Sequence, residues 1–331
     1  MTLLCCALYG CIAISRKHVV PQTEIHPALQ ATEPELIAAY NRQAAAIRTV
    51  NATVTMSPVA GSAYSGVIEE YHDVGGFILA ARPAMIRVIG QAPVVSKNIF
   101  DMVSDGRTFR IFIPSKNRFL VGSTALERSA KSPIENLRPQ HILDAFFWPV
   151  IPAGSPVLFE AFDAPPNRFY IISLVRSSRS GLELDRKTWF DRSDLRIART
   201  QIYGSNGTVD SDITYSDWQP VADSAPAGSA SSPSNSAEVS TSAIPAGLLF
   251  PREIRISRPQ QDYQLTVSIT KLVLNASISS DRFELMQPPG TELTRVGDDP
   301  QSQPGDSAPD QAQQAPDLRE RQRSNPPAER K

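Results

Sequence analysis

Short runs of β-forming residues, separated by turn signals, recur along most of the chain. Residues 50–57 alternate strictly between apolar and polar side chains, which predicts a strand with one buried face. Between residues 66 and 114 further runs follow one another without a helix, and residues 73–76 read Asp-Val-Gly-Gly, a hairpin signal. We therefore expect an antiparallel meander that winds into a curved sheet.

The strand pattern continues beyond residue 114. Predicted strands cover residues 117–121, 157–162, 169–175, 181–185, 188–190, 195–203, 208–218, 250–257 and 263–274, and a short run at 283–285 closes the domain. The run at 169–175 is apolar on both faces. Such a strand needs cover on two sides, which a helix, a lid or a bound lipid can supply.

Two helices interrupt the strand pattern. Thr32 and Glu35 give a capping box, and apolar residues then recur at three- and four-residue spacing as far as Ile47. This pattern predicts an N-terminal amphipathic helix that packs on the sheet. Residues 139–148 predict a short second helix, with Pro139 at its start and Pro149 at its end.

The second helix carries a large apolar surface for its length, formed by Ile142, Leu143, Phe146, Phe147 and Trp148. These side chains are either ordinary core that plugs one end of the sheet or a lid over an apolar cavity. The sequence alone slightly favours core, because apolar stripes on helices usually face a core.

Composition divides the chain into one folded domain and flanking segments. Residues 12–31 are predicted to be a tether, because from Ser15 onward the chain is polar and punctuated by proline. Residues 221–243 are rich in Ser, Ala and Pro, and residues 291–331 lack periodicity, so we expect a disordered insertion and a disordered tail. One domain remains at residues 32–290. The net charge of −1 gives no overall field for nucleic acid, and we expect no nucleic-acid partner.

All three cysteines, Cys5, Cys6 and Cys11, lie in an apolar opening segment, so the domain itself has no disulfide and no cysteine-ligated metal. Residues 8–11 resemble the bacterial lipobox, whose cysteine receives lipid, which makes residues 1–11 a lipoprotein signal and Cys11 a lipid anchor. The segment has no Lys or Arg and is shorter than the roughly 15 to 30 residues of an ordinary signal. It is therefore either a truncated signal or an apolar tail that frays or anchors weakly.

The chain lacks the usual catalytic signatures. Its four histidines, His18, His26, His72 and His141, are scattered, and neither His-Glu-x-x-His nor Gly-x-Ser-x-Gly occurs. We expect no enzymatic activity, no cofactor and no metal. A hydrolase centred on His72 or His141 is the alternative.

The order of these segments resembles a known family. The similar stretches are Gly76 to Pro83 followed by Met85-Ile-Arg87, Ser104-Asp-Gly106, Leu182 to Asp185, Tyr215 to Trp218 and Pro251 to Ile254. They resemble the LolA/LolB-like superfamily of bacterial lipoprotein-localisation factors and outer-membrane lipoproteins, over about residues 33–289. The resemblance implies a mainly β fold, an incomplete antiparallel β-barrel (half-barrel) wrapped round a helical lid that encloses an apolar cavity for acyl chains. It also implies that Arg82 and Arg87 lie near the cavity mouth, where a guanidinium can pair with a phosphate head group.

The resemblance and the anchor together imply a function. We expect a monomeric periplasmic lipoprotein, tethered to the outer membrane, that binds lipid acyl chains or the lipid moiety of an acylated lipoprotein in the half-barrel and takes part in envelope lipid or lipoprotein trafficking. The alternative is a non-enzymatic structural or assembly lipoprotein that binds an envelope protein through its loops.

Overall fold

The computed structural model describes residues 27–62, 67–70, 74–92, 97–124, 139–164, 166–179, 181–221 and 248–296. The predicted signal with Cys11, the tether up to residue 26, almost all of the predicted insertion and the chain after residue 296 lie outside these ranges. Among the residues that are described, no helix combines the length and the apolar character needed to cross a membrane.

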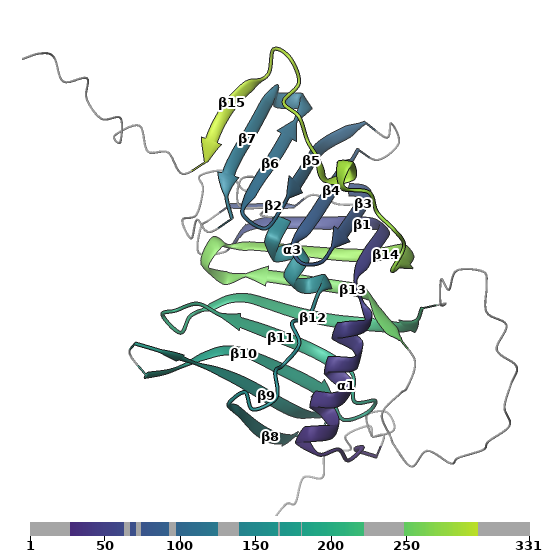
Figure 1. Ribbon diagram of the computed structural model, residues 1–331, viewed down its shortest axis with the longest axis vertical. Helices are drawn as coiled ribbons and strands as arrows, with labels where there is room; N and C mark the ends of the chain where they lie inside the picture. The colour runs from purple at the N-terminus through teal and green to yellow at the C-terminus, as the bar shows by residue number, and fades with distance from the viewer. Residues whose placement is uncertain are drawn as a thin grey trace, which may run out of the picture. The chain divides into compact units, whose positions relative to one another are not determined.

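In the described part of the chain, fifteen strands form one open sheet (Figure 1). They are β1 (Thr49–Ser62), β2 (Val67–Glu70), β3 (Val74–Ala81), β4 (Met85–Gln91), β5 (Asn98–Ser104), β6 (Thr108–Ile113), β7 (Arg118–Ser123), β8 (Val157–Ala164), β9 (Asn167–Ser178), β10 (Gly181–Asp191), β11 (Ile197–Tyr203), β12 (Val209–Pro220), β13 (Leu249–Arg258), β14 (Tyr263–Leu274) and β15 (Glu292–Val296). Their spatial order is β15-β7-β6-β5-β4-β3-β1-β14-β13-β12-β11-β10-β9-β8, with β2 beside β1. Strands β8 and β15 end the order without pairing to each other, so the predicted incomplete barrel is confirmed.

Two helices lie against one face of the sheet, which we call the inner face (Figure 1). Helix α1 (Glu33–Ala46) begins at the predicted capping box, where the Glu35 carboxylate accepts hydrogen bonds from the backbone N–H and the hydroxyl of Thr32, both at 2.8 Å. Its Tyr40 ring packs edge-on against Phe190 of β10 at 6.4 Å. Helix α3 (Pro139–Phe146) places Phe146 5.9 Å from the ring of Phe250 on β13. Both predicted helices are therefore present.

The hairpin predicted at residues 73–76 is wrong. Gly75 and Gly76 lie inside β3, and both β2 and β3 pair with β1, so β3 does not fold back on β2. The reason for glycine is close approach between strands: a Cβ on Gly76 would lie 2.1 Å from the carbonyl oxygen of Ile89 on β4. Gly76 therefore permits tight pairing, whereas a Cβ on Gly75 would meet nothing within 4 Å.

Three further boundaries differ from the sequence predictions. The runs at 181–185 and 188–190 belong to a single strand, β10. The run at 283–285 is no strand; a 3₁₀ turn at Ser280–Phe283 buries Phe283 instead. The sheet also extends past residue 290, because β15 pairs in parallel with β7. Strand β15 is mostly exposed and its side chains do not alternate in burial, so its sequence carried no strand signal.

Candidate functional site

The apolar side chains predicted for the lid are all buried against the inner face. Ile142, Leu143, Phe146, Phe147 and Trp148 are between 0% and 6% exposed. Trp148 donates a hydrogen bond from Nε1 to the hydroxyl of Tyr215 at 3.1 Å and stacks on Trp218 at 5.7 Å. Of the two alternatives, the structure shows these residues as core; a ligand contact for them stays a prediction.

Arg82 links the chain that follows α3 to helix α1. Its guanidinium donates to the carbonyl oxygens of Ile47, Ala44 and Trp148 at 2.9, 3.0 and 2.8 Å. It also lies 4.9 Å from the centre of the Phe147 ring. The side chain thus joins the C-terminal end of α1 to the chain just after α3.

Arg87 lies on the opposite face of the sheet. It alternates along β4 with Ile86 and Val88, which belong to the main core. Its guanidinium forms a two-point ion pair with Asp101, at 3.0 and 2.7 Å, and donates to the carbonyl of Arg282 at 2.9 Å. The structure therefore does not bring the two predicted arginines together, and their contact with a head group stays a prediction.

Two small cavities lie beside the chain that follows α3. We call residues 139–153, which comprise α3 and this following chain, the cover segment. One cavity of about 100 Å³ has walls that include Tyr40, Ile151, Ile172 and Leu174. A second, of about 50 Å³, lies between α1, Trp148 and Trp218. Both are lined largely by apolar side chains.

The larger cavity is also lined by Arg186, which the sequence analysis did not single out. A register shift in β10 places it there: Leu184 opposes Val175 of β9, whereas Arg186 opposes Leu174. The extra residue is Asp185, so the strand carries a β-bulge that turns Arg186 to the inner face. Arg186 fell between two predicted strands, and continuing the alternation back from Phe190 would have revealed it.

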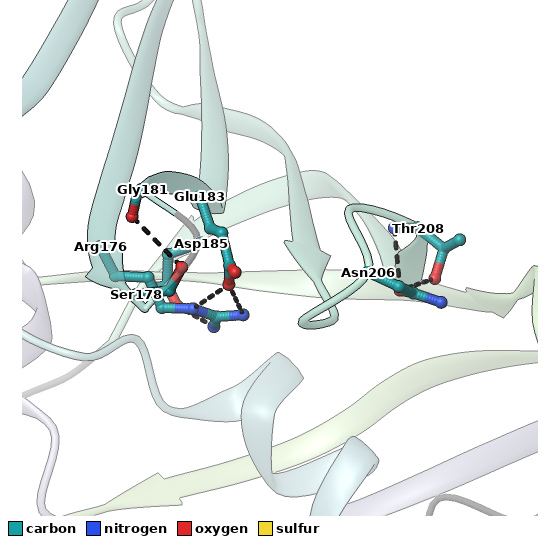
Figure 2. A network of polar contacts seen from close by, with 7 residues as sticks. All are labelled: Arg176, Ser178, Gly181, Glu183, Asp185, Asn206 and Thr208. Carbon is teal, nitrogen blue, oxygen red and sulfur yellow. Dashed lines mark hydrogen bonds and ion pairs between the residues drawn. The ribbon is translucent and has the colours of Figure 1, made fainter.

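The polar groups around the bulge are engaged in an ion-pair network (Figure 2). Arg176 donates to Asp185 at 2.9 Å and to Glu183 at 3.4 Å, while Ser178 donates to the carbonyl of Gly181 at 3.2 Å. The Asp185 carboxylate is thereby directed to Arg176. By contrast, Nε and Nη1 of Arg186 are buried and have no hydrogen-bond partner among the described residues.

A second arginine, Arg258, also lies on the inner face, three strands away from Arg186. Arg186 opposes Ile202 of β11, which opposes Ser211 of β12. The Ser211 hydroxyl accepts a hydrogen bond from Nη1 of Arg258 on β13 at 2.9 Å, and that nitrogen lies 2.7 Å from Nδ1 of His141 on α3. His141 is thus in contact with an arginine of the sheet.

Asp144 brings a carboxyl group from α3 into the same interior. Burial raises the pKa of this carboxyl, and the guanidinium groups of Arg186 and Arg258 act in the opposite direction. Arg186, Arg258 and the Asp144 carboxyl therefore lie close together between the cover segment and the sheet, and Asp185 also lines the larger cavity.

No group of three or more His, Cys, Asp or Glu residues in the described part of the chain is arranged to hold a metal ion. Cys11, His18, His26 and His72 lie outside the described residues, so the predictions that rest on them remain predictions.

Comparisons with known proteins give distant structural matches. No family model matches the sequence, and no curated protein matches it either. Among solved structures, the chain is similar to a LolA superfamily protein from Nitrosomonas europaea (TM-score 0.44, 11% identity, 77% of this chain and 99% of that chain). It is similar to a DUF1329 family protein from Desulfovibrio piger (TM-score 0.44, 12% identity, 75% of this chain and 94% of that chain). The chain is also similar to a putative outer-membrane lipoprotein-sorting protein domain from Vibrio parahaemolyticus (TM-score 0.41, 8% identity, 75% of this chain and 95% of that chain). The superfamily that the sequence resembles is thus represented among the structures to which the chain is similar.

Proposed function

We propose that this chain binds the acyl chain of a lipid, or the lipid moiety of an acylated lipoprotein, between the inner face of the sheet and the cover segment, without covalent chemistry. The observation that supports this most is the pair of cavities at the cover segment, walled by Tyr40, Ile172 and Leu174 in one and by Trp148 and Trp218 in the other. The sheet there is covered by a short helix and an irregular chain and not by a second sheet.

Acyl-chain binding requires the cover segment to move. Ligand pockets usually hold about 300 to 1,000 Å³, whereas these cavities measure about 100 and 50 Å³. Beyond α3, the segment is held by the Arg82 contact to Trp148 and by Asn41, which exchanges two hydrogen bonds with the backbone of Ile151 at 2.9 and 2.8 Å. Burial of several methylene groups, at about 0.8 kcal/mol each, is sufficient for micromolar binding after ordering costs.

The protein that does this is proposed to be a monomeric lipoprotein on the periplasmic face of the outer membrane, anchored through Cys11 and acting in envelope lipid or lipoprotein trafficking. The lipobox-like residues 8–11 support the anchor. Mass spectrometry of membrane-extracted protein is expected to show an acylated Cys11; a chain with Cys11 unmodified contradicts the anchor.

Native mass spectrometry of the purified chain, followed by lipid extraction, tests the binding proposal. We expect a co-purifying lipid, and we expect the fluorescent acyl probe 11-(dansylamino)undecanoate to bind. Leu174→Trp fills the larger cavity and should weaken probe binding at least about fivefold. Val175→Trp, the adjacent residue on the outer face, is the matched control and should leave it unchanged. Equal affinities for both variants would contradict a site on the inner face.

A second candidate function is assembly through a protein partner. Edge strand β8 exposes Leu158 and Phe162, which are 60% and 46% accessible, and exposed apolar residues on an edge strand favour contact with another chain. Absence of any bound lipid and of probe binding, with capture of one specific envelope protein, would favour this function over the first.

A further inference from the structure

We propose that Arg186 binds the anionic head group of the ligand, a carboxylate or a phosphate, while the alkyl chain lies against Ile172 and Leu174. The inference rests on the proposed function and extends it by naming the chemistry of the ligand's polar end. Its basis is a half-buried arginine, two of whose guanidinium nitrogens are buried, at the wall of a cavity lined largely by apolar side chains.

The first argument is the direction of the side chain. The β-bulge at Asp185 makes Arg186 oppose Leu174, so that arginine and leucine line the same cavity. Bulges that re-aim a side chain are common beside functional sites. An amphiphile needs an apolar wall and a polar group next to each other, and here they are cross-strand neighbours.

The second argument is the missing partner. Buried donors are nearly always hydrogen-bonded, and leaving one unpaired costs free energy. Nε and Nη1 of Arg186 are buried without a partner among the described residues. These two nitrogens donate from different edges of the guanidinium, so each can donate a charge-assisted hydrogen bond to an oxygen of a carboxylate or phosphate.

The third argument is the local charge. The neighbouring carboxylate of Asp185 is directed to Arg176, and among the described side chains no ion pair joins Asp144 to Arg186. Asp185 also lines the cavity, and the Asp144 carboxyl from α3 is close enough to Arg186 and Arg258 for both guanidinium groups to lower its pKa. The Arg186 guanidinium therefore lines the cavity without an ion pair among the described residues, which favours an anionic ligand.

Calorimetric titration of the full-length chain with dodecanoate, dodecyl phosphate and dodecanol tests the inference. These ligands share a twelve-carbon chain and differ in the head group. We expect both anions to bind at least about tenfold more tightly than dodecanol. Arg186→Met should abolish that preference while changing dodecanol affinity less than about twofold, and Arg186→Lys should retain part of it. Lys187→Met removes the adjacent charge on the opposite face of the sheet and should leave the affinities for all three ligands unchanged.

The outcomes separate the inference from the function on which it rests. If dodecanol binds but the anions have no advantage in the wild-type chain, the head-group inference fails and acyl-chain binding stands; this readout needs no variant. Equal weakening of all three ligands by Arg186→Met also overturns it. Inorganic phosphate that binds as tightly as dodecyl phosphate would assign the site to free anions and not to a lipid. If none of the twelve-carbon ligands binds, the proposed function itself fails.

Discussion

At the scale of single residues, charged groups inside the half-barrel join its parts. Arg82 is bonded to three backbone carbonyls that come from α1 and from the chain after α3. Two of these carbonyls belong to the last turn of α1, where orphan acceptors and the helix dipole both favour a cation. One side chain thus completes a helix end and closes the cover over the sheet.

Replacing Arg82 is therefore expected to weaken the fold. Arg82→Met should lower the free energy of unfolding by about 2 to 3 kcal/mol, because hydrogen bonds from a charged donor contribute more than neutral ones. The free energy of unfolding of Arg82→Lys should lie between those of Arg82→Met and the wild type. Urea unfolding measures the change, with Arg110→Met at an exposed position of β6 as the control. A loss no larger than that of the control would show that the Arg82 contacts are not stabilising.

Asp144 gives the interior a pH dependence. Burial raises the pKa of its carboxyl in the folded chain, so between the unfolded pKa near 4 and the raised folded pKa the folded state binds more protons than the unfolded state. Stability contributed by this group is present at low pH and is lost as pH rises through that window. Asp144→Asn should therefore make the unfolding free energy less dependent on pH above about 4. Asp281→Asn, at an exposed site, is the control; identical pH profiles for Asp144→Asn and wild type would contradict the assignment.

At the scale of elements, alternation of apolar and polar residues was a good guide where one face is buried. It located β1 and β14, while three- and four-residue spacing located α1, because each buries one face against the core. The bounding prolines located α3. Alternation failed for β15, which is mostly exposed and is held by parallel pairing to β7. It also failed at the bulge in β10, since one inserted residue reverses the alternation that the prediction relies on.

Strand β15 protects an edge of the sheet. A chain that ends at residue 290 loses β15 and exposes the unpaired backbone of β7, so we expect a melting temperature lower by a few degrees, about 1 kcal/mol, and increased self-association. A chain that ends at residue 297 retains β15 and should match the full-length protein. Thermal melting and light scattering compare the two; equal behaviour of both truncations would show that β15 adds nothing.

At the scale of the whole domain, the molecule is one open sheet whose inner face is filled by α1 and the cover segment. The half-barrel and the lid could be predicted from the order of strands and helices and from the family resemblance. The candidate site was missed, because Arg186 fell between two predicted strands that the bulge puts out of phase, and because Arg82 and Arg87, equal in sequence terms, lie on opposite faces. Position relative to the sheet is a tertiary property that single-sequence patterns do not carry.

The central claim, that acyl chains enter between the cover segment and the inner face, can be tested with the protein's own tryptophans. Trp148 lies inside, against Tyr215, whereas Trp189 lies on the outer face beside Arg199. Two single-tryptophan chains are needed, one keeping Trp148 and the other keeping Trp189, with the remaining tryptophans changed to Phe. A bromine-labelled fatty acid, which quenches only tryptophans near its bromine atoms, is expected to quench Trp148 and spare Trp189. Quenching of Trp189 alone, or of neither at a ligand concentration that binds, would contradict the account.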